Sequence, residues 1–155
     1  MPGRRTDVTT RSAAATFVVN SLAAKAQSVA EIEAKLARRG VSAADAASVV
    51  ADAVRLGYLD DAELAGQLAR GFVSRGYGRR RAETALRRRG LPAGLADDAL
   101  GAAYGDQDEV TLARKALGSR ATDDDAARRR AAAFLARRGF SSAAAWQAVR
   151  ARSTD

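Results

Sequence analysis

A phrase of six residues occurs three times in the chain at an almost constant interval. Each copy has a leucine, then a basic pair, then a glycine followed by an apolar residue; the copies are residues 36–41, 86–91 and 135–140. Their glycines, Gly40, Gly90 and Gly139, are 50 and then 49 residues apart. A repeated interval of this length indicates one supersecondary unit that is written several times and shares its core with its neighbours.

The apolar residues of these units have helical spacing. They recur at intervals of three, four and seven, and no segment shows the strict alternation of a half-buried strand. We therefore expect an all-α protein, a tandem array of three three-helix repeats. The predicted domains are a disordered N-terminal arm at 1–10 and repeats at 11–56, 57–105 and 106–155. The predicted helices are 11–26, 29–39, 43–56, 61–75, 79–89, 92–104, 108–119, 123–138 and 142–152.

Local signals set the ends of these helices. Ser28 and Glu31 form a capping-box pattern, in which side chains and backbone N–H groups satisfy one another at a helix start. Looser versions of this pattern are Asp60 with Glu63 and Thr122 with Asp125. The glycine of each phrase stands where a helix end favours a left-handed residue.

The missing residue types exclude several kinds of site. The chain has no histidine and no cysteine, which removes the commonest general base, the thiol nucleophile and any His/Cys zinc site. The acids at 60–63 are compatible with a metal-dependent nuclease, but negative charge at a helix start is the ordinary explanation. We expect no enzyme, no catalytic residue, no cofactor and no metal. The absence of cysteine and of a long apolar run fits a cytoplasmic protein without a membrane span.

Arginine dominates the charge of the chain. There are 26 basic and 18 acidic residues, and only three of the basic residues are lysines; the sequence pI is about 10.9. The basic pairs 38–39, 88–89 and 137–138 fall at predicted helix ends, where a cation is favoured by about 0.3–1 kcal/mol. A helix-end role therefore explains these pairs better than a purely partner-binding role.

The cluster Arg79, Arg80 and Arg81 breaks this rule. It occupies the first turn of the helix predicted at 79–89, where positive charge is unfavourable, whereas the other two repeats carry acids there. An anion would relieve the repulsion, because backbone N–H groups and guanidinium groups would converge on it. A violation of a local rule is where function is expected.

Spacing extends this cluster into a stripe. Residues seven apart return to nearly the same helix face, about 20° off, so Arg80 shares a face with Arg87. The stripe suits a phosphate backbone or an acidic protein groove, and Tyr77 beside it could stack on a base. The candidate partner- or DNA-binding residues are Arg75, Tyr77, Arg79, Arg80, Arg81, Arg87, Arg88 and Arg89.

A second basic cluster lies at Arg128, Arg129 and Arg130. It follows the aspartates at 123–125 by a few residues, so pairs of aspartate and arginine within one helix can satisfy it. We expect a solvated, self-paired face here and keep the three arginines as weaker candidates for partner or DNA binding.

Residues 57–65, 75–81 and 86–91 resemble the RecX family, the regulatory proteins of the bacterial recombinase RecA. The similarity covers about residues 13–150. Leu64 departs from the aromatic residue usual in the family, and Ala82 from the common isoleucine. The family-motif residues are Gly57, Tyr58, Leu59, Asp60, Asp61, Gly78, Leu86 and Gly90.

The resemblance implies three three-helix repeats in an elongated, curved arrangement. It also implies a protein that binds RecA and the RecA–DNA filament and inhibits the recombinase, ATPase and coprotease activities, modulating DNA repair and the SOS response. DNA itself, single- or double-stranded, would bind weakly, and we expect a monomer. The alternative is a general basic DNA-binding protein that acts on RecA only by competing for DNA.

Overall fold

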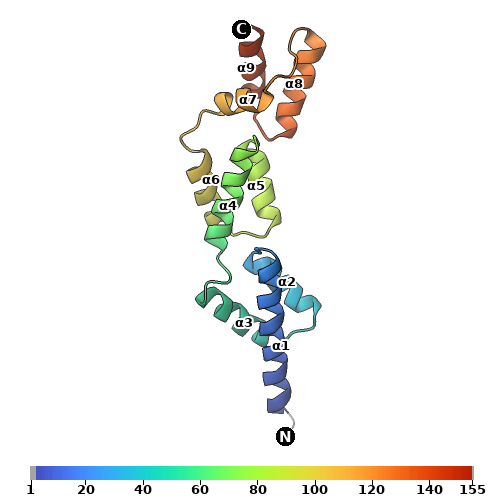
Figure 1. Cartoon of the computed structure of the whole chain (residues 1–155), viewed down its shortest axis with the longest axis vertical. Coiled ribbons are helices and arrows are strands. Elements are labelled where there is room, and N and C mark those ends of the chain that lie inside the picture. Colours follow the sequence, from blue (N-terminus) through green and yellow to red (C-terminus); the bar gives the residue numbers. More distant parts are fainter. Residues whose placement is uncertain (1–2, 155) are drawn as a thin grey trace. The chain divides into compact units, whose positions relative to one another are not determined.

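The structure, a computed structural model, describes the backbone of residues 3–154 and the side chains of residues 11–154. The described part contains nine α-helices and no strand (Figure 1). In chain order they are α1 (Gly3–Ala24), α2 (Val29–Arg38), α3 (Ala43–Arg55), α4 (Asp61–Ser74), α5 (Arg79–Arg88), α6 (Ala93–Tyr104), α7 (Glu109–Leu117), α8 (Asp125–Arg137) and α9 (Ser142–Ser153). The all-α prediction is confirmed.

The predicted helix bounds agree with the structure to within two residues, with one exception. Helix α1 begins at Gly3, whereas the sequence placed its start at Arg11. Residues 1 and 2 of the predicted disordered arm lie outside the described residues, and so do the side chains of residues 3–10. The disorder of the arm therefore stays a prediction.

The chain divides into two compact units. The first unit comprises Met1–Leu64 and Arg88–Pro92, and the second comprises Ala65–Arg87 and Ala93–Asp155. We call the repeated six-residue phrase the Arg-Arg-Gly phrase. The first unit thus holds α1, α2, α3 and the start of α4, together with residues 88–91, which are the Arg-Arg-Gly part of the second phrase and the leucine after it. The second unit holds the rest of α4, α5 up to Arg87, helices α6 to α9 and the third phrase.

The core of the first unit joins α1, α2 and α3. Val18 of α1 and Ile32 and Leu36 of α2 are at most 1% exposed, and Val49, Val50 and Ala53 of α3 close over them. Leu59, just beyond α3, belongs to the same cluster. The leucine of the first phrase is therefore a core residue, as helical spacing predicts.

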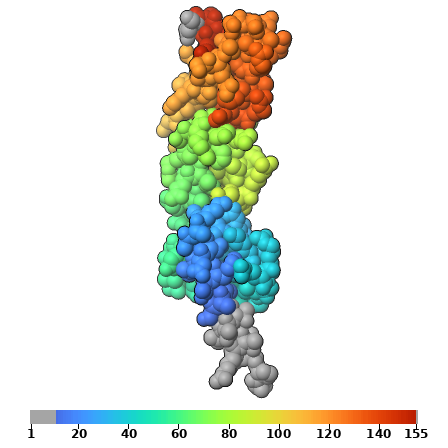
Figure 2. Space-filling view, turned by 45° about the vertical axis from the view of Figure 1, so that its right-hand side comes forward, coloured from blue at the N-terminus to red at the C-terminus, as the bar shows by residue number. Residues whose placement is uncertain are grey.

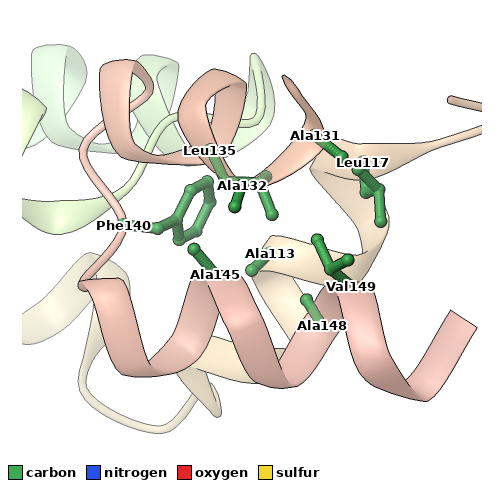
Figure 3. Close-up of a cluster of buried hydrophobic side chains, with 9 residues drawn as sticks. All are labelled: Ala113, Leu117, Ala131, Ala132, Leu135, Phe140, Ala145, Ala148 and Val149. Carbon is green, nitrogen blue, oxygen red and sulfur yellow. The ribbon is translucent and has the colours of Figure 1, made fainter. Parts of the chain in front are cut away.

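The core of the second unit is built largely from alanine. Five of the nine residues in its main cluster are alanines (Figure 3), so α7, α8 and α9 approach one another closely over a thin core. Leu135 and Phe140, from the third phrase, are 0% and 3% exposed. The outer side of α8 lies at the surface of this unit (orange in Figure 2).

Helix ends follow the capping predictions with one correction. Ser28 and Glu31 form the full capping box, and the Asp60 carboxylate accepts from the Glu63 N–H at 3.0 Å. The prediction that Thr122 caps the eighth helix is wrong, because the Asp124 carboxylate accepts from the Ala127 N–H at 2.7 Å. Thr122 is buried instead, and α8 starts two residues later than predicted.

Candidate partner-binding surface

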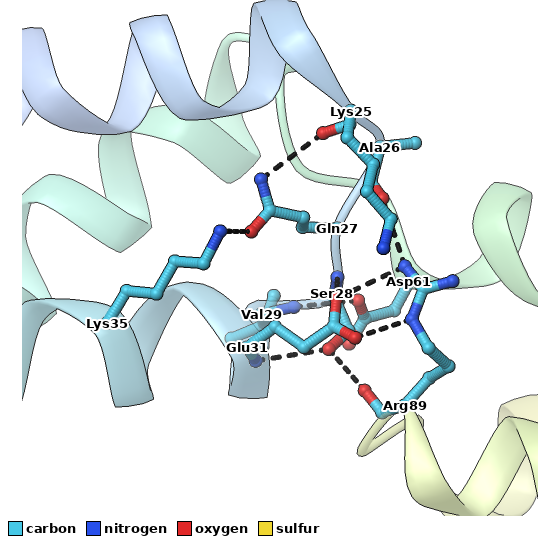
Figure 4. A network of polar contacts seen from close by, with 9 residues as sticks. All are labelled: Lys25, Ala26, Gln27, Ser28, Val29, Glu31, Lys35, Asp61 and Arg89. Carbon is cyan, nitrogen blue, oxygen red and sulfur yellow. Dashed lines mark hydrogen bonds and ion pairs between the residues drawn. The ribbon is translucent and has the colours of Figure 1, made fainter.

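In the first unit, the second arginine of the Arg-Arg-Gly phrase holds a helix start. The Arg89 Nε donates to the Glu31 carboxylate at 2.5 Å, and its Nη2 donates to the Ala26 carbonyl at 2.9 Å. The Ser28 hydroxyl donates to the Arg89 carbonyl at 2.5 Å (Figure 4). The phrase is therefore fixed to the N-terminus of α2 through side chain and backbone together.

The Glu31 carboxylate is central to this junction. Burial alone would raise the pKa of Glu31, but the hydrogen bond from Arg89 and the backbone N–H of Ser28 hold the pKa below its ordinary value. The ion pair is partly shielded, with 22% and 27% of the Arg89 and Glu31 side chains exposed. Partial burial strengthens such a pair relative to one in open water.

The second unit repeats this junction with different chemistry. The Gly78 N–H, at the position equivalent to Ser28, donates to the Arg138 carbonyl at 2.8 Å. The Arg138 Nη1 donates to the Arg75 carbonyl at 2.8 Å, and its guanidinium lies 4.5 Å from the centroid of the Tyr77 ring. Here an aromatic face takes the place of the carboxylate.

The use of Tyr77 in place of a carboxylate explains part of the unusual positive charge in the first turn of α5. Arg81 stands at the position equivalent to Glu31, and its Nη1 donates to the Arg137 carbonyl at 3.2 Å. Arg138 contacts the Tyr77 ring and donates to the Arg75 carbonyl, so it does not need a carboxylate at position 81 as a partner. The expectation that all three arginines at 79–81 lack compensation is therefore wrong for Arg81.

The remaining members of the predicted stripe differ in availability. Arg79, Arg80 and Arg88 are exposed, while Arg87 is also exposed but pairs with Glu83 at 2.7 Å on the same helix. Arg89 is half-buried and engaged with Glu31, so it belongs to the fold. On the part of α5 that lies in the second unit, all four arginines are exposed; Arg81 donates to the Arg137 carbonyl and Arg87 pairs with Glu83, while Arg79 and Arg80 form neither kind of contact.

Tyr77 precedes α5 and packs among aromatic and arginine side chains. The Tyr77 ring is half-buried against Phe72 at 5.4 Å between centroids, and the Arg75 guanidinium lies over Phe72 at 4.8 Å. The Tyr104 hydroxyl donates to the Tyr77 carbonyl at 2.8 Å. Burial raises the pKa of Tyr104 to about 12, against the opposing charge of Arg79, so this hydroxyl remains a donor at neutral pH.

The three arginines of the second predicted cluster, at 128–130, differ in their contacts. Arg128 pairs with Asp125 at 2.9 Å and donates to the Thr122 carbonyl at 3.1 Å, which confirms the predicted pairing within the helix. Arg129 and Arg130 are exposed. Only the first of the three arginines is therefore satisfied in the way the sequence suggested.

Most of the family-motif residues build the fold. Gly57 and Gly90 have φ of 81° and 74°, and a Cβ on Gly90 would come within 2.7 Å of the Ala30 methyl. Leu59 and Leu86 are buried. Tyr58 is the exception, since 55% of it is exposed.

The two aspartates of the motif have structural partners. Asp60 caps α4, and the Asp61 carboxylate accepts from the Val29 N–H at 3.0 Å (Figure 4). Among the residues whose side chains are described, no group of three acids is placed to hold a metal ion. The helix-start interpretation of the acids at 60–63 therefore accounts for the observed contacts.

Comparison with known proteins identifies the family. The description of the second three-helix domain of RecX matches residues 60–100, and that of the third matches residues 110–149. Regulatory protein RecX of Deinococcus radiodurans is 34% identical over 143 residues, which cover 90% of this chain and 68% of that protein. The chain belongs to the RecX family. It is a regulatory protein of that family, and its recognition from the motif is confirmed.

Other RecX proteins agree with this assignment. Regulatory protein RecX of Chlorobaculum tepidum is 29% identical over 143 residues, which cover 90% of this chain and 86% of that protein. The crystal structure of RecX from Lactobacillus salivarius has the same fold, with a TM-score of 0.79 at 19% identity over 96% of this chain and 99% of that one. A second crystal structure, of a regulatory protein RecX, gives a TM-score of 0.75 at 16% identity over 94% of this chain and 74% of that one. No described helix is long and apolar enough to cross a membrane.

Proposed function

We propose that this RecX-family protein binds RecA and the RecA–DNA filament and inhibits the recombinase, ATPase and coprotease activities of RecA. In the cell this would modulate DNA repair and the SOS response, from the cytoplasm and without catalysis by the protein itself. The family membership carries the proposal. The exposed basic face of α5 supports it, because a RecA–DNA filament offers phosphates as partners for arginine.

The geometry of α5 suits such a partner. Arg80 and Arg87 are seven residues apart on one helix and both are exposed, so they point from nearly the same face. The opposite face is anchored by Ala82 and Leu86, which are fully buried. The planar guanidinium of arginine can form two hydrogen bonds at once with phosphate or carboxylate, so it loses less conformational entropy per hydrogen bond than lysine does.

The direct test is the DNA-dependent ATPase of RecA with this protein added. We expect inhibition at substoichiometric amounts, because a regulator that acts on a filament affects many RecA subunits per bound molecule. An unchanged ATPase rate across the titration would contradict the regulatory role.

The rival function is a basic DNA-binding protein that competes with RecA for DNA. Phosphate contacts make the logarithm of the affinity fall steeply with the logarithm of the salt concentration. Binding to naked DNA that is weak at physiological salt, while RecA–DNA filaments are bound tightly, would favour the regulator. Equal affinity for naked DNA and filaments at every salt concentration would favour the competitor.

A further inference from the structure

Thr84 lies in the middle of α5, with arginines before and after it. Its side chain is exposed, and its hydroxyl donates to the Arg80 carbonyl at 3.1 Å, one helical turn earlier. Residues three and four apart are neighbours on a helix surface, so Arg80 and Arg81 lie one turn before Thr84 and Arg87 lies one turn after it. The adjacent acid, Glu83, already pairs with Arg87 at 2.7 Å. Thr84 is therefore the hydroxyl at the centre of the basic face of α5.

The residues before Thr84 form a pattern that protein kinases recognise. Many serine/threonine kinases prefer arginine three residues before the accepting hydroxyl, because acidic groups of the kinase cleft bind the guanidinium group. The hydroxyl residues of the chain with arginine at this position are Ser42, Thr84, Ser141 and Ser153. Thr84 alone has arginines at the three positions from three to five residues before it. The pattern thus favours Thr84 as a kinase substrate.

The other three hydroxyls hold parts of the fold. Ser42 and Ser141 accept from backbone N–H groups at the starts of α3 and α9. The Ser153 hydroxyl donates to the carbonyl of Thr122 at 3.3 Å, on a distant segment of the chain. The Thr84 hydroxyl contacts only its own helix, so its modification disturbs no contact between segments.

The start of α5 is weakly held, and this allows the extended form that a kinase cleft accepts. The first turn contains three arginines and no acid, which is unfavourable at the positive end of the helix dipole. Gly78, which precedes this turn, has no side chain with which to cap the free N–H groups. Ala82 is the sole buried residue at positions 79–84, so unwinding them exposes one methyl group and gives up the exposed bond from Arg81 to the Arg137 carbonyl.

We propose that Thr84 is a phosphorylation site for a serine/threonine kinase that recognises the arginines at 79–81. The Thr84 Oγ1 attacks the terminal phosphorus of a nucleoside triphosphate and forms an O–P bond, while the bond from that phosphorus to the bridging oxygen breaks. The nucleoside diphosphate leaves with the electron pair of the broken bond, and the hydroxyl proton passes to the general base of the kinase. The modification does not involve RecA and is separate from the proposed inhibition.

A phosphate on Thr84 would cancel much of the exposed charge of α5. It carries a charge of about −1.5 to −2 at pH 7 and three acceptor oxygens, and it lies one turn from Arg80 and from Arg87. In the refolded helix these guanidinium groups pair with the phosphate instead of with an external anion. The modification therefore stabilises α5 and lowers its affinity for a polyanion. That it thereby releases RecA–DNA filaments rests on the proposed function.

The site is tested on the full chain with ATP and a calcium/calmodulin-dependent protein kinase, which prefers arginine three residues before its target. Mass spectrometry with fragmentation of the intact protein locates the phosphate. We expect phosphate on Thr84, added at least about tenfold more slowly in Arg81→Ala because one charge-assisted contact to the kinase is lost. Thr16 is the internal control, since it is an exposed helical threonine with no charged residue within four positions. Phosphate on the other three hydroxyls but not on Thr84, or no phosphate at all, would overturn the site.

The effect of the charge is tested with Thr84→Glu against Thr84→Gln, which has a similar size and no charge. We expect Thr84→Glu to raise the midpoint of thermal unfolding by about 2 °C through pairs with Arg80 and Arg87, and to weaken binding of RecA–DNA filaments about fivefold. Thr16→Glu against Thr16→Gln makes the same change of charge away from arginine and should alter neither quantity. Equal midpoints for Thr84→Glu and Thr84→Gln would overturn the pairing. A raised midpoint with unchanged filament binding would support the pairing and contradict only the role of α5 in the proposed function.

Discussion

The Arg89 guanidinium and the Glu31 carboxylate meet at 2.5 Å across 58 residues of sequence. The same carboxylate completes the capping box of α2 by accepting from the Ser28 N–H at 2.9 Å. One acid therefore serves both a helix start and a contact to the next copy of the phrase. In the second unit the corresponding arginine, Arg138, contacts the Tyr77 ring and the Arg75 carbonyl. An arginine of the phrase therefore makes a contact to an earlier part of the chain in both units, but its partner is a carboxylate in one and an aromatic ring with a carbonyl in the other.

Removing the Glu31 carboxylate should therefore cost more than a surface acid normally does. We expect Glu31→Ala to lower the free energy of unfolding by about 2 kcal/mol, because it removes a cap and leaves the partly shielded Arg89 without its partner. Urea denaturation followed by circular dichroism measures this. Glu33→Ala is the matched control, since Glu33 is an exposed acid on the same helix; an equal loss in the two variants would contradict the junction.

The free energy of unfolding at acidic pH should also depend on the Arg89–Glu31 ion pair. The pKa of Glu31 is held below its ordinary value of 4.5, so its contribution is complete above that pH and is lost as the pH falls through the lower pKa of the folded state. Glu31→Gln carries no charge at any pH and should lose less stability below about pH 4.5 than the wild type does. Parallel loss in both proteins on urea titrations between pH 6 and pH 3 would count against the ion pair.

Gly78 is expected to be irreplaceable although its backbone is not in the left-handed region. A Cβ there would meet the Gly139 carbonyl carbon and oxygen at 2.5 Å and the Phe140 nitrogen at 2.7 Å. Because these are backbone atoms, held close by the hydrogen bond from the Gly78 N–H to the neighbouring Arg138 carbonyl, we expect Gly78→Ala to cost about 1–3 kcal/mol. Gly101→Ala, in open space on α6, should instead stabilise the protein by about 0.5–1 kcal/mol. Thermal unfolding of the two variants should therefore shift in opposite directions.

The helices were predictable because their causes are local. The leucine of each phrase, Leu36, Leu86 and Leu135, is 0% exposed, and Gly40, Gly90 and Gly139 all have positive φ, between 74° and 97°. Helical spacing and the conformational freedom of glycine decide both features within one or two turns. The start of α8 was misplaced because the sequence pattern favours Thr122 as its N-cap, whereas the Asp124 carboxylate caps this helix and Thr122 is buried.

The contacts of Arg81, Arg89 and Arg138 were not predictable, because their partners lie about 60 positions away in the sequence. Nothing local distinguishes Arg89, which pairs with Glu31, from Arg88, which is exposed. Arg81 looked uncompensated because its acceptor, the Arg137 carbonyl, comes from another repeat.

Asp61 should prove to be a structural acid. Its carboxylate accepts from the Val29 N–H at the start of α2, so Asp61→Ala leaves a helix-start donor without its partner and should cost about 1–2 kcal/mol. Asp61→Asn keeps an acceptor oxygen and should cost less. Thermal unfolding ranks the variants, and RecA inhibition by Asp61→Asn should remain intact below its unfolding temperature. Inhibition lost in a fully folded Asp61→Asn would instead assign this carboxylate a role in function.

Charge reversal on α5 should separate binding from folding. Arg80→Glu with Arg87→Glu changes two exposed side chains, and only the Arg87–Glu83 pair, at 2.7 Å on the surface, is lost. We expect stability to fall by less than about 1 kcal/mol, and affinity for RecA–DNA filaments to fall at least about tenfold if each arginine contributes one charge-assisted contact.

The comparison for this variant is Arg38→Glu with Arg39→Glu, which has the same change of charge. The Arg39 guanidinium lies 3.9 Å from the Phe17 centroid at the end of α2, where a cation is favoured, so this variant should lose stability by about 1–2 kcal/mol. Filament co-sedimentation and urea denaturation together distinguish the two variants. Filament binding that is unchanged in the α5 variant would mean that Arg80 and Arg87 are simply solvated.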